Sequence, residues 1–588
     1  MALLNKKQLM RLTAPVLSGL FLLALQACQM GAQPVKPATQ QAQPGLVNTK
    51  IGQSNGVETQ YQENADLVYL LMLAEMAAQK GELAISVQSY LKAANASDDP
   101  AIAERATRVA SFARDYPSAM KAAERWAELQ PKNLDVHHSL VILYLRNKQL
   151  DKAVDAVDLV LKLTAKSKIQ GFGHLVALLN NETDKEAVLA LMDRVVSNYK
   201  NNTHAHFAYA RLAFQSEKYA LARAQVEEAI SIKPDYDAAR SLLARIQMVQ
   251  GETDAALATM RKLVEENPES TTHRAAYARL LAVAKRYDDA LKQFQQVLKA
   301  SPDNADIIYA IALLTLEQRK FKMSEKYFRQ LIAKHKRVYE SYFYLGNIAE
   351  NRKKFSAAIA WYKQVQHGQN KVDAGIRVTR LLARQGKVND ARTYLQSMHT
   401  QDPNLSIRLY VVEIDILTAA GANEEAMKVA NNSLNRFKDN PDLLYARSLL
   451  AEKMDKLDLA EADLKTILAT DPENVHALNA LGYTLADRTE RLQEAYGYIQ
   501  QAIKLAPEEP AVLDSMGWVL YRMGRSRDAI GYLRQALKIM QDDEIAAHLG
   551  EVLWVTGLKK EATEVWKKAL EAKPNSVHIK DVLKRFNQ

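Results

Sequence analysis

The sequence predicts an all-α protein, a superhelical solenoid of about fifteen helix pairs that follows a disordered tether. Three observations predict it. Only 21 of 588 residues are glycine, whereas residues that lose little freedom in a helix are abundant. Alanines recur every 33 to 35 residues over most of the chain, and prolines follow the same period. A period of this length exceeds one helix and is typical of stacked helical repeats.

The period is defined by an alanine that we place in the second helix of each pair. Ser324 fills the one gap in the series. The alanines are Ala84, Ala119, Ala153, Ala187, Ala222, Ala256, Ala290, Ala358, Ala391, Ala426, Ala460, Ala495, Ala529 and Ala562.

Two other positions keep the same register. Twelve residues after the alanine, eight units have a proline: Pro131, Pro234, Pro268, Pro302, Pro403, Pro472, Pro507 and Pro574. Twelve residues before it, a small residue recurs, and an insertion displaces one of these, Gly482. The others are Ala210, Ala244, Ala278, Ala312, Gly346, Ser448, Gly517 and Gly550.

These positions suit two helices that pack closely. Small residues on both helices allow close approach, and a large apolar residue four after the alanine, such as Phe294 or Trp566, fills the remaining space. Proline cannot continue a helix, so it should end the second one. In the early units, Met72, Thr107 and Val141 take the place of the small residue, which leaves divergent repeats and looser hairpins both open.

The pattern resembles the tetratricopeptide repeat (TPR) family over about residues 66–574. The match is strongest in Asn479-Ala-Leu-Gly-Tyr to Pro507, Gly517 to Ala536, and Gly550 to Pro574. The resemblance implies a right-handed superhelix whose first helices line a concave, protein-binding surface. We assign residues 63–202 to divergent TPR-like repeats, 203–575 to the regular array and 576–588 to a capping helix.

The N-terminus is typical of an exported lipoprotein. Lys6, Lys7 and Arg11 precede an apolar run from Val16 to Leu25, which is too short to span a bilayer and fits a secretory signal. The following Leu25-Gln26-Ala27-Cys28 resembles a lipobox. Residues 1–27 are therefore predicted to be a signal peptide, and Cys28, the single cysteine, to carry the lipid. The alternative is an ordinary signal peptide with a chance cysteine.

Residues 28–62 are predicted to be the lipidated cysteine and a flexible tether. The stretch is rich in Gln and Pro and has few large apolar residues, so it cannot bury enough surface to order itself. Gln29 follows the cysteine, and in lipoproteins that resemble those of enteric bacteria the absence of Asp there favours the outer membrane. The expected location is the periplasmic face of the outer membrane of a Gram-negative bacterium.

Arginine follows the small first-helix residue in three consecutive units, at Arg211, Arg245 and Arg279. One repeat apart, these side chains should form a ladder that could grip carboxylates or an acidic segment. Arg108 and Arg380 occupy the same position in other units. The alternative is that these positions are simply solvated, because arginine is a good helix former.

The first predicted helix is apolar on nearly every side, with Leu67, Leu70 and Leu71 in its middle. Terminal repeats need a polar outer face, so this excess indicates a docking surface for a partner or a second copy of the chain. The alternative is that residues 64–79 pack against the next pair as a core helix. Near the other end, Trp518, Tyr521 and Trp554 are interpreted as repeat core rather than interface anchors.

No catalytic or cofactor-binding motif is found in the sequence. It has no phosphate-binding glycine loop, no His-Glu-x-x-His and no nucleophile elbow. The histidine pairs His137-His138 and His204-x-His206 have no acidic or cysteine partner at metal-ligand spacing and are interpreted as surface residues. The net charge of +10 falls to +7 without the three basic residues of the signal peptide, and no basic block indicates nucleic acid. We expect no enzymatic activity, no cofactor and no metal.

The whole chain looks like the LbcA-type lipoproteins, on the lipobox, the tether and the runs His476 to Arg488 and Leu513 to Arg522. That resemblance implies an adaptor that binds a periplasmic carboxyl-terminal processing protease and brings it cell-wall hydrolases. The alternatives are an assembly factor for an outer-membrane secretion, polysaccharide-export or pilus machine and, more distantly, a peptidoglycan-acting enzyme with a repeat body.

Overall fold

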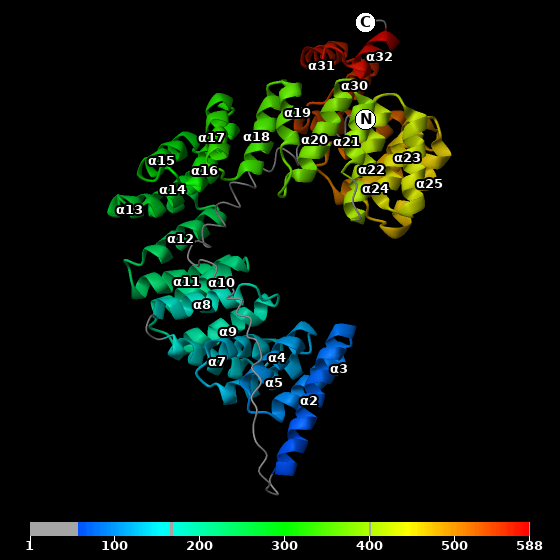
Figure 1. Ribbon diagram of the computed structural model, residues 1–588. Helices are drawn as coiled ribbons and strands as arrows, with labels where there is room; N and C mark the ends of the chain where they lie inside the picture. Colours follow the sequence, from blue (N-terminus) through cyan, green and yellow to red (C-terminus); the bar gives the residue numbers. More distant parts are fainter. Residues whose placement is uncertain (1–56, 165–167, 399–401, 587–588) are drawn as a thin grey trace. The chain divides into compact units, whose positions relative to one another are not determined.

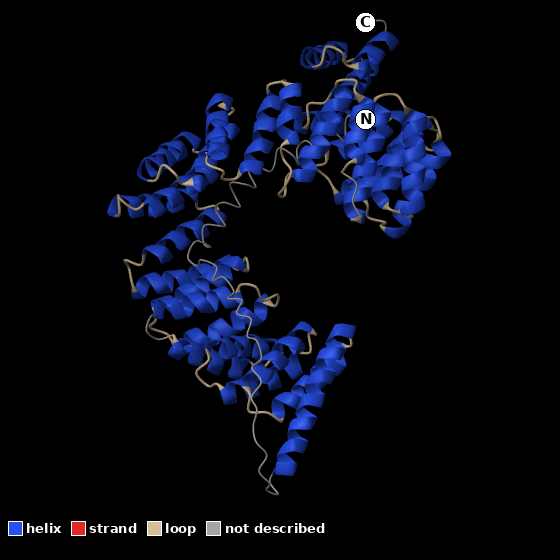
Figure 2. Ribbon diagram, viewed as in Figure 1, coloured by secondary structure: helices blue, strands red, loops and turns tan. Residues whose placement is uncertain are grey.

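The computed structural model describes residues 57–164, 168–398 and 402–586 (Figure 1). Every regular element in these ranges is a helix (Figure 2). They number 31, which equals fifteen pairs and one terminal helix, so the predicted fold class is confirmed. The predicted signal peptide, Cys28 and the tether up to residue 56 lie outside the described residues.

The described residues divide into two compact units at residue 318. The N-terminal unit contains α2 (Val57–Lys80), α3 (Leu83–Asn95), α4 (Pro100–Phe112), α5 (Tyr116–Leu129), α6 (Leu134–Arg146), α7 (Leu150–Leu163), α8 (Lys168–Leu179), α9 (Lys185–Asn198), α10 (Thr203–Gln215), α11 (Tyr219–Ile232), α12 (Asp237–Val249), α13 (Thr253–Glu266), α14 (Thr271–Val283), α15 (Tyr287–Ala300) and α16 (Ala305–Glu317).

The C-terminal unit continues the series to the last described helix. It contains α17 (Phe321–Ala333), α18 (Val338–Asn351), α19 (Phe355–Lys363), α20 (Lys371–Arg384), α21 (Val388–Gln396), α22 (Pro403–Ala419), α23 (Asn423–Arg436), α24 (Pro441–Lys453), α25 (Leu457–Thr470), α26 (Val475–Arg488), α27 (Leu492–Leu505), α28 (Pro510–Arg522), α29 (Ser526–Ile539), α30 (Asp543–Val555), α31 (Lys559–Ala572) and α32 (Val577–Arg585). The last of these lies within residues 576–588, for which the sequence predicts a capping helix.

The repeat alanines and their small partners are the points of closest helix approach. From Ala222 onward every alanine in the series, and Ser324, is completely buried. A Cβ atom added to Gly346, Gly517 or Gly550 would overlap the large side chain sixteen residues later, which is Tyr362, Leu533 or Trp566. In these three pairs a small residue on the first helix therefore makes room for a large residue on the second, as predicted.

The turn inside many pairs contains one residue with left-handed backbone. Glycine occupies it at Gly251 (φ +86°) and Gly524 (φ +79°), but Glu217 (φ 59°) and Lys285 (φ 60°) occupy the equivalent place in other pairs. Glycine reaches this conformation without steric cost, whereas other residues do not. The turns thus repeat in geometry even where the sequence gives no glycine.

The prolines act as predicted with one exception. Pro234, Pro268 and Pro472, for example, lie two residues beyond the end of the second helix. Pro403 instead begins α22, where Asp402 caps the helix by accepting from the Asn404 amide at 3.0 Å. Proline is tolerated in this first turn because its missing N–H would have had no partner.

The first repeat departs from the predicted register. Ala84 and Met72 are both exposed, while Ala74 and Ser86 are fully buried and keep the twelve-residue offset. The true register of this pair is therefore two residues later. In addition, α2 begins at Val57, inside the stretch assigned to the tether, because the residues before position 63 include Glu and Gln, which are good helix formers.

Candidate protein-binding surface

The three arginines of the predicted ladder lie on neighbouring helices. Arg211, Arg245 and Arg279 are on α10, α12 and α14, and α12 packs beside both of the other two. In each case the alanine before the arginine is fully buried. Because successive helical residues point about 100° apart, the three arginine side chains leave the core in the same direction relative to their helices. We call the face that carries these three side chains the arginine face.

Aromatic rings support two of the guanidinium groups. The Arg211 guanidinium lies over the ring of Phe207 at 5.9 Å, and that of Arg245 over Phe214 at 4.7 Å. Phe207 also meets the ring of Tyr236 edge to face, with the centroids 5.1 Å apart. A cation held over a ring is attracted by its quadrupole. The arginine face is therefore partly built from aromatic surface.

The arginines are only partly exposed, and burial affects their electrostatics. The pKa of Arg279 lies below its ordinary value because burial disfavours the charged form; attraction by Asp306 opposes this, and repulsion by Arg245 adds to it. Among the described residues, neither Arg211 nor Arg279 takes part in an ion pair, and the Nε atom of each is buried without a hydrogen-bond partner. An arginine remains charged under these conditions.

Other units neutralise the same position within the chain. Arg380 faces Asp415 of the next first helix at 3.8 Å, and burial raises the pKa of that carboxyl to about 6, although Arg380 opposes the shift. Arg108 pairs with Glu104 on its own helix and is largely exposed. Arg211 and Arg279 differ from both, because neither forms an ion pair with another described residue.

A second group of polar residues joins α26, α28, α30 and α32. His548 Nδ1 lies 3.0 Å from Asp514, and both side chains are buried. Trp518 stacks on the His548 ring at 4.3 Å and donates to Asp487 at 3.0 Å. Trp518 is buried, which confirms its assignment to the repeat core.

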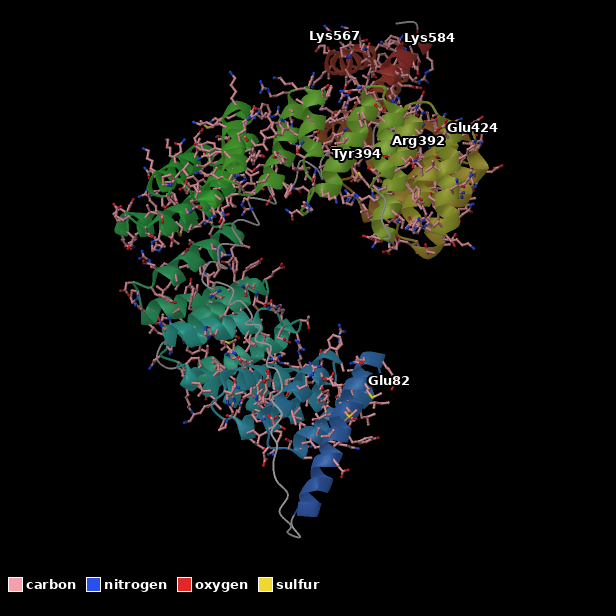
Figure 3. All side chains as sticks on the ribbon, in the orientation of Figure 1. Glu82, Arg392, Tyr394, Glu424, Lys567 and Lys584 are labelled. Atoms are coloured by element: carbon pink, nitrogen blue, oxygen red, sulfur yellow. The ribbon has the colours of Figure 1, made fainter. Side chains whose placement is uncertain are left out.

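Neither the buried His548–Asp514 pair nor the bidentate contact of Arg585 with Glu551, at 3.0 and 2.6 Å, was predicted from the sequence. Lys584 lies on the terminal helix α32 (Figure 3). The next residue, Arg585, is exposed and links α32 to α30. Each of these two contacts joins residues 34 positions apart. An acidic residue one repeat before a histidine or arginine is the sequence signal that predicts such contacts.

The four histidines of the two close pairs were interpreted as surface residues, and this is wrong for two of these histidines. His137 and His206 are buried, and the Nε2 atoms of their rings lie 2.8 Å from the backbone oxygens of Pro131 and Lys200. They hold the loop that enters a first helix. Among the residues that the structure describes, no group of three or more His, Cys, Asp or Glu side chains is placed to hold a metal ion.

The predicted docking residues of the first helix are not its most exposed ones. Leu67, Leu70 and Leu71 are half-buried, and Leu71 packs against the core. The exposed apolar side chains of α2 are Val68, Tyr69, Met72 and Met76. One side of the helix therefore packs as core and another is open. None of the described helices is both long and apolar enough to cross a membrane.

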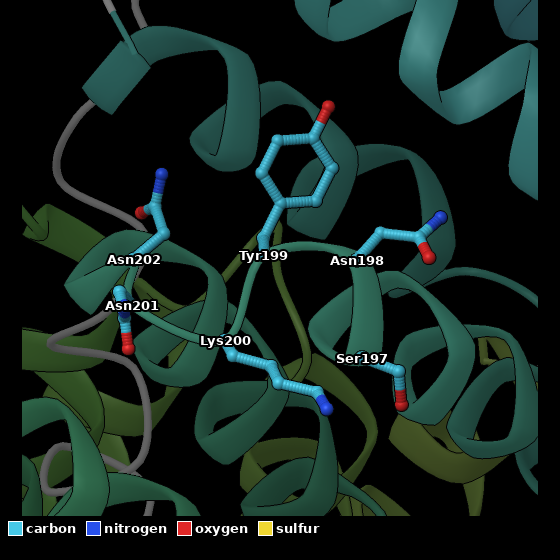
Figure 4. Close-up of a pocket in the computed structure, with 6 residues that line it drawn as sticks. All are labelled: Ser197, Asn198, Tyr199, Lys200, Asn201 and Asn202. Carbon is cyan, nitrogen blue, oxygen red and sulfur yellow. The ribbon is translucent and has the colours of Figure 1, made fainter.

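A hollow of about 380 Å³ lies at the turn between α9 and α10 (Figure 4). Six consecutive residues, from Ser197 to Asn202, line it. Asn202 caps α10 by accepting from the His204 amide at 2.9 Å, and Tyr199 packs edge to face against Phe172. These side chains stabilise the turn and bring no acid–base pair together.

Comparison with known proteins agrees with this architecture. Tetratricopeptide-repeat family profiles match residues 213–283 and, with a second profile, residues 309–371, 445–510 and 515–577. The TPR repeat-containing protein PA4667 of Pseudomonas aeruginosa is 38% identical over 552 residues, which cover 92% of this chain and 91% of that protein. The chain belongs to the tetratricopeptide-repeat family.

Solved structures are also similar to this TPR protein, at low sequence identity. A thermophilic TPR protein of Thermus thermophilus is 22% identical, with a TM-score of 0.29 over 31% of this chain and 100% of its own. A tetratricopeptide repeat protein of Parabacteroides merdae is 19% identical, with a TM-score of 0.34 over 42% of this chain and 97% of its own. The Cut9–Hcn1 assembly of the APC/C is 14% identical, with a TM-score of 0.33 over 90% of this chain and 97% of its own.

Proposed function

We propose that this TPR protein is a membrane-anchored adaptor that binds a periplasmic carboxyl-terminal processing protease and presents peptidoglycan hydrolases to it. TPR arrays are scaffolds for protein–protein interaction. The observation that carries the proposal is the arginine face, where Arg211 and Arg279 form no ion pair among the described residues. Charges left over by the fold of a scaffold are available to a partner.

The N-terminal sequence supports the membrane anchor. A lipobox-like segment ends at Cys28, and a stretch rich in Gln and Pro separates it from α2. Lipidation at Cys28 would hold the array at the periplasmic face of the outer membrane while leaving it free to reach partners. Two proteins held by one tethered scaffold meet at a raised effective concentration, so cleavage becomes faster without any chemistry from the scaffold.

Affinity capture tests the proposal. The chain lacking residues 1–28 is immobilised and exposed to a periplasmic extract, and the bound proteins are identified by mass spectrometry. We expect a carboxyl-terminal processing protease together with at least one peptidoglycan hydrolase. Recovery of secretion, polysaccharide-export or pilus components without a protease would instead support the assembly-factor function. A matched Cys28→Ser chain should leave the membrane fraction of intact cells, and its retention there would contradict the anchor.

A further inference from the structure

The basic residues of this protein are concentrated in one part of the C-terminal unit. Residues 319–371 contain thirteen Lys or Arg and three Asp or Glu, a net charge of +10 that equals the net charge of all 588 residues. The segment contains α17, α18 and α19, and each of these helices packs against the next (Figure 1). The charges are spread over two helices and several turns, so they form no long run in the sequence.

Like charges recur at the repeat spacing in this segment. Pairs of basic residues that are 34 positions apart are Arg319 with Lys353, Lys320 with Lys354, Arg329 with Lys363 and Arg337 with Lys371. Elsewhere the same spacing joins opposite charges, as in Arg585 with Glu551 at 2.6 Å. A concentration of like charge repels itself and lowers stability, so its presence here favours a function for the charge.

Most of these basic side chains are exposed to solvent, eleven of the thirteen. The three acidic residues of the segment each pair with an arginine, as Glu325 does with Arg329 at 2.8 Å. Seven exposed lysines take part in no ion pair with another described residue, namely Lys322, Lys326, Lys336, Lys353, Lys354, Lys363 and Lys371. We call these seven lysines the basic surface.

Aromatic side chains lie among these charges. The half-buried Trp361 ring stacks on Tyr342 with the centroids 5.8 Å apart, and the Arg329 guanidinium lies over it at 5.1 Å. The Lys363 ammonium lies over the ring of Tyr394 at 5.5 Å. Tryptophan and tyrosine rings have an apolar body and a polar tip, and they favour the boundary between lipid and water. Lysine suits the same boundary, because its apolar stem can lie on apolar surface while its ammonium group stays in water.

The position of the basic surface in the fold favours a broad target. Helices α17 and α19 are the second helices of their pairs, and in a TPR array the second helices lie on the convex side. A peptide or a nucleic-acid strand is usually held in a groove, whereas a bilayer can meet a convex surface over a wide area. Lysine ammonium groups are compact point charges without the forked geometry of arginine, and such groups suit mobile lipid phosphates.

We propose that the basic surface binds the anionic phospholipid headgroups of the bilayer to which the chain is anchored. This inference rests on the membrane location in the proposed function, and it adds a second membrane contact to the lipid at Cys28. The lysine ammonium groups bind lipid phosphates, and Trp361 lies at the level of the headgroups. The first helices of the same repeats then face away from the bilayer, where a partner protein can reach them.

Vesicle sedimentation tests the inference. The chain lacking residues 1–28, which keeps every described residue and has no cysteine to carry a lipid, is mixed with vesicles of phosphatidylcholine alone or of phosphatidylcholine and phosphatidylglycerol in equal amounts. We expect at least about tenfold tighter binding to the mixed vesicles, because each lysine near an anionic surface adds to the attraction. This binding should weaken as salt is added, since exposed charges are screened.

A triple variant locates the contact on the chain. Lys322→Gln, Lys326→Gln and Lys363→Gln together remove three exposed lysines from α17 and α19. The variant should bind the mixed vesicles at least about tenfold more weakly than the unsubstituted chain.

The matched control removes the same charge from another second helix, α31. It combines Lys560→Gln, Lys567→Gln and Lys568→Gln, which are also exposed, and Figure 3 labels Lys567. Lys560 and Lys567 occupy the same repeat positions as Lys322 and Lys363. The control should bind the mixed vesicles as the unsubstituted chain does. Circular dichroism melting shows whether each variant is folded.

Several results would overturn the inference. These are equal binding to both kinds of vesicle, equal affinities of the two triple variants for the mixed vesicles, or tighter binding of a labelled single-stranded oligodeoxynucleotide than of the mixed vesicles.

A salt wash separates this contact from the lipid anchor. Attachment by charge alone is weak and reversible, whereas several acyl chains hold a protein stably. A high-salt wash should therefore release from cell membranes any Cys28→Ser chain that the basic surface retains, and it should leave the unsubstituted chain in place. If the vesicles do not bind and the unsubstituted chain resists the wash, the basic-surface inference is wrong and the anchor stands. If the vesicles bind as expected and the wash removes the unsubstituted chain, the reverse holds.

Discussion

At the scale of single residues, the buried pair of His548 and Asp514 makes the C-terminal repeats sensitive to pH. Burial alone would lower the pKa of the histidine, but Asp514, with help from Glu544 and Glu551, outweighs burial and raises it to about 9. Because folding raises the pKa of His548, the protonated histidine stabilises the folded state. This stabilisation is complete at pH values below the ordinary pKa near 6.5, and it is lost as the pH rises through about 9.

We therefore expect the free energy of unfolding to fall by up to about 3 kcal/mol between pH 6.5 and pH 9.5. Urea titrations followed by tryptophan fluorescence measure it, because Trp518 stacks on the histidine. In His548→Gln the titrating group is gone, so the fall should be smaller. The same pH dependence in both proteins would contradict the assignment.

Gly550 shows why some repeat positions accept no side chain. A Cβ atom at this residue would overlap the Trp566 ring, whereas one at Gly531 would meet nothing within 4 Å. We expect Gly550→Ala to lower the free energy of unfolding by about 1–3 kcal/mol through overpacking. Gly531→Ala, in the middle of α29, should raise it by about 0.5–1 kcal/mol, because alanine favours helix. Urea unfolding of both variants checks the pair, and equal effects would refute the packing argument.

At the scale of elements, the turn inside most pairs contains one left-handed residue. Gly251 adopts φ +86° and Lys285 φ +60° at equivalent places. Gly251→Ala should cost about 1 kcal/mol, and Lys285→Gly should gain a similar amount, since only glycine reaches this backbone region freely. Thermal unfolding of the two variants measures the difference. A lower melting temperature for Lys285→Gly would show that the lysine side chain has a stabilising role of its own.

Much of this element order could be predicted from the sequence, because a repeated packing contact leaves a repeated residue. Ala290 and Phe294, four apart on one helix, are both fully buried as the period requires. The first pair could not be placed as well, since Ala84 matches the period and yet is exposed, while Ser86 takes the buried position. The sequence period reflects the packing of an average repeat, which has a neighbour on both sides. A terminal repeat packs against a neighbour on one side only, so its buried positions can differ.

The positions of the three arginines could be predicted from the sequence, but the side chains that surround them could not. The spacing of Arg211, Arg245 and Arg279 placed them on neighbouring helices, as the structure shows. The aromatic ring of Phe214 beneath Arg245 could not be foreseen, because it comes from the previous first helix and lies off the repeat register. Contacts of this kind depend on the rotation between successive pairs, which a linear period does not contain.

At the scale of the whole molecule, the described residues form one kind of element repeated along two units. Opposite charges about one repeat apart pair within the chain, as Arg392, which Figure 3 labels, does with Glu425 at 2.8 Å. In the function proposed above, the arginine face binds a partner protein. In the account proposed above, the anchor at Cys28 decides where that binding takes place.

The measurement that tests this account most directly is the rate at which a purified periplasmic carboxyl-terminal processing protease cleaves a purified peptidoglycan hydrolase, with and without the full chain. An adaptor that holds both proteins should raise the rate at least about tenfold at limiting concentrations, with an optimum in adaptor concentration because excess scaffold separates the two. A cleavage rate that the chain leaves unchanged, with both proteins active, would contradict the account.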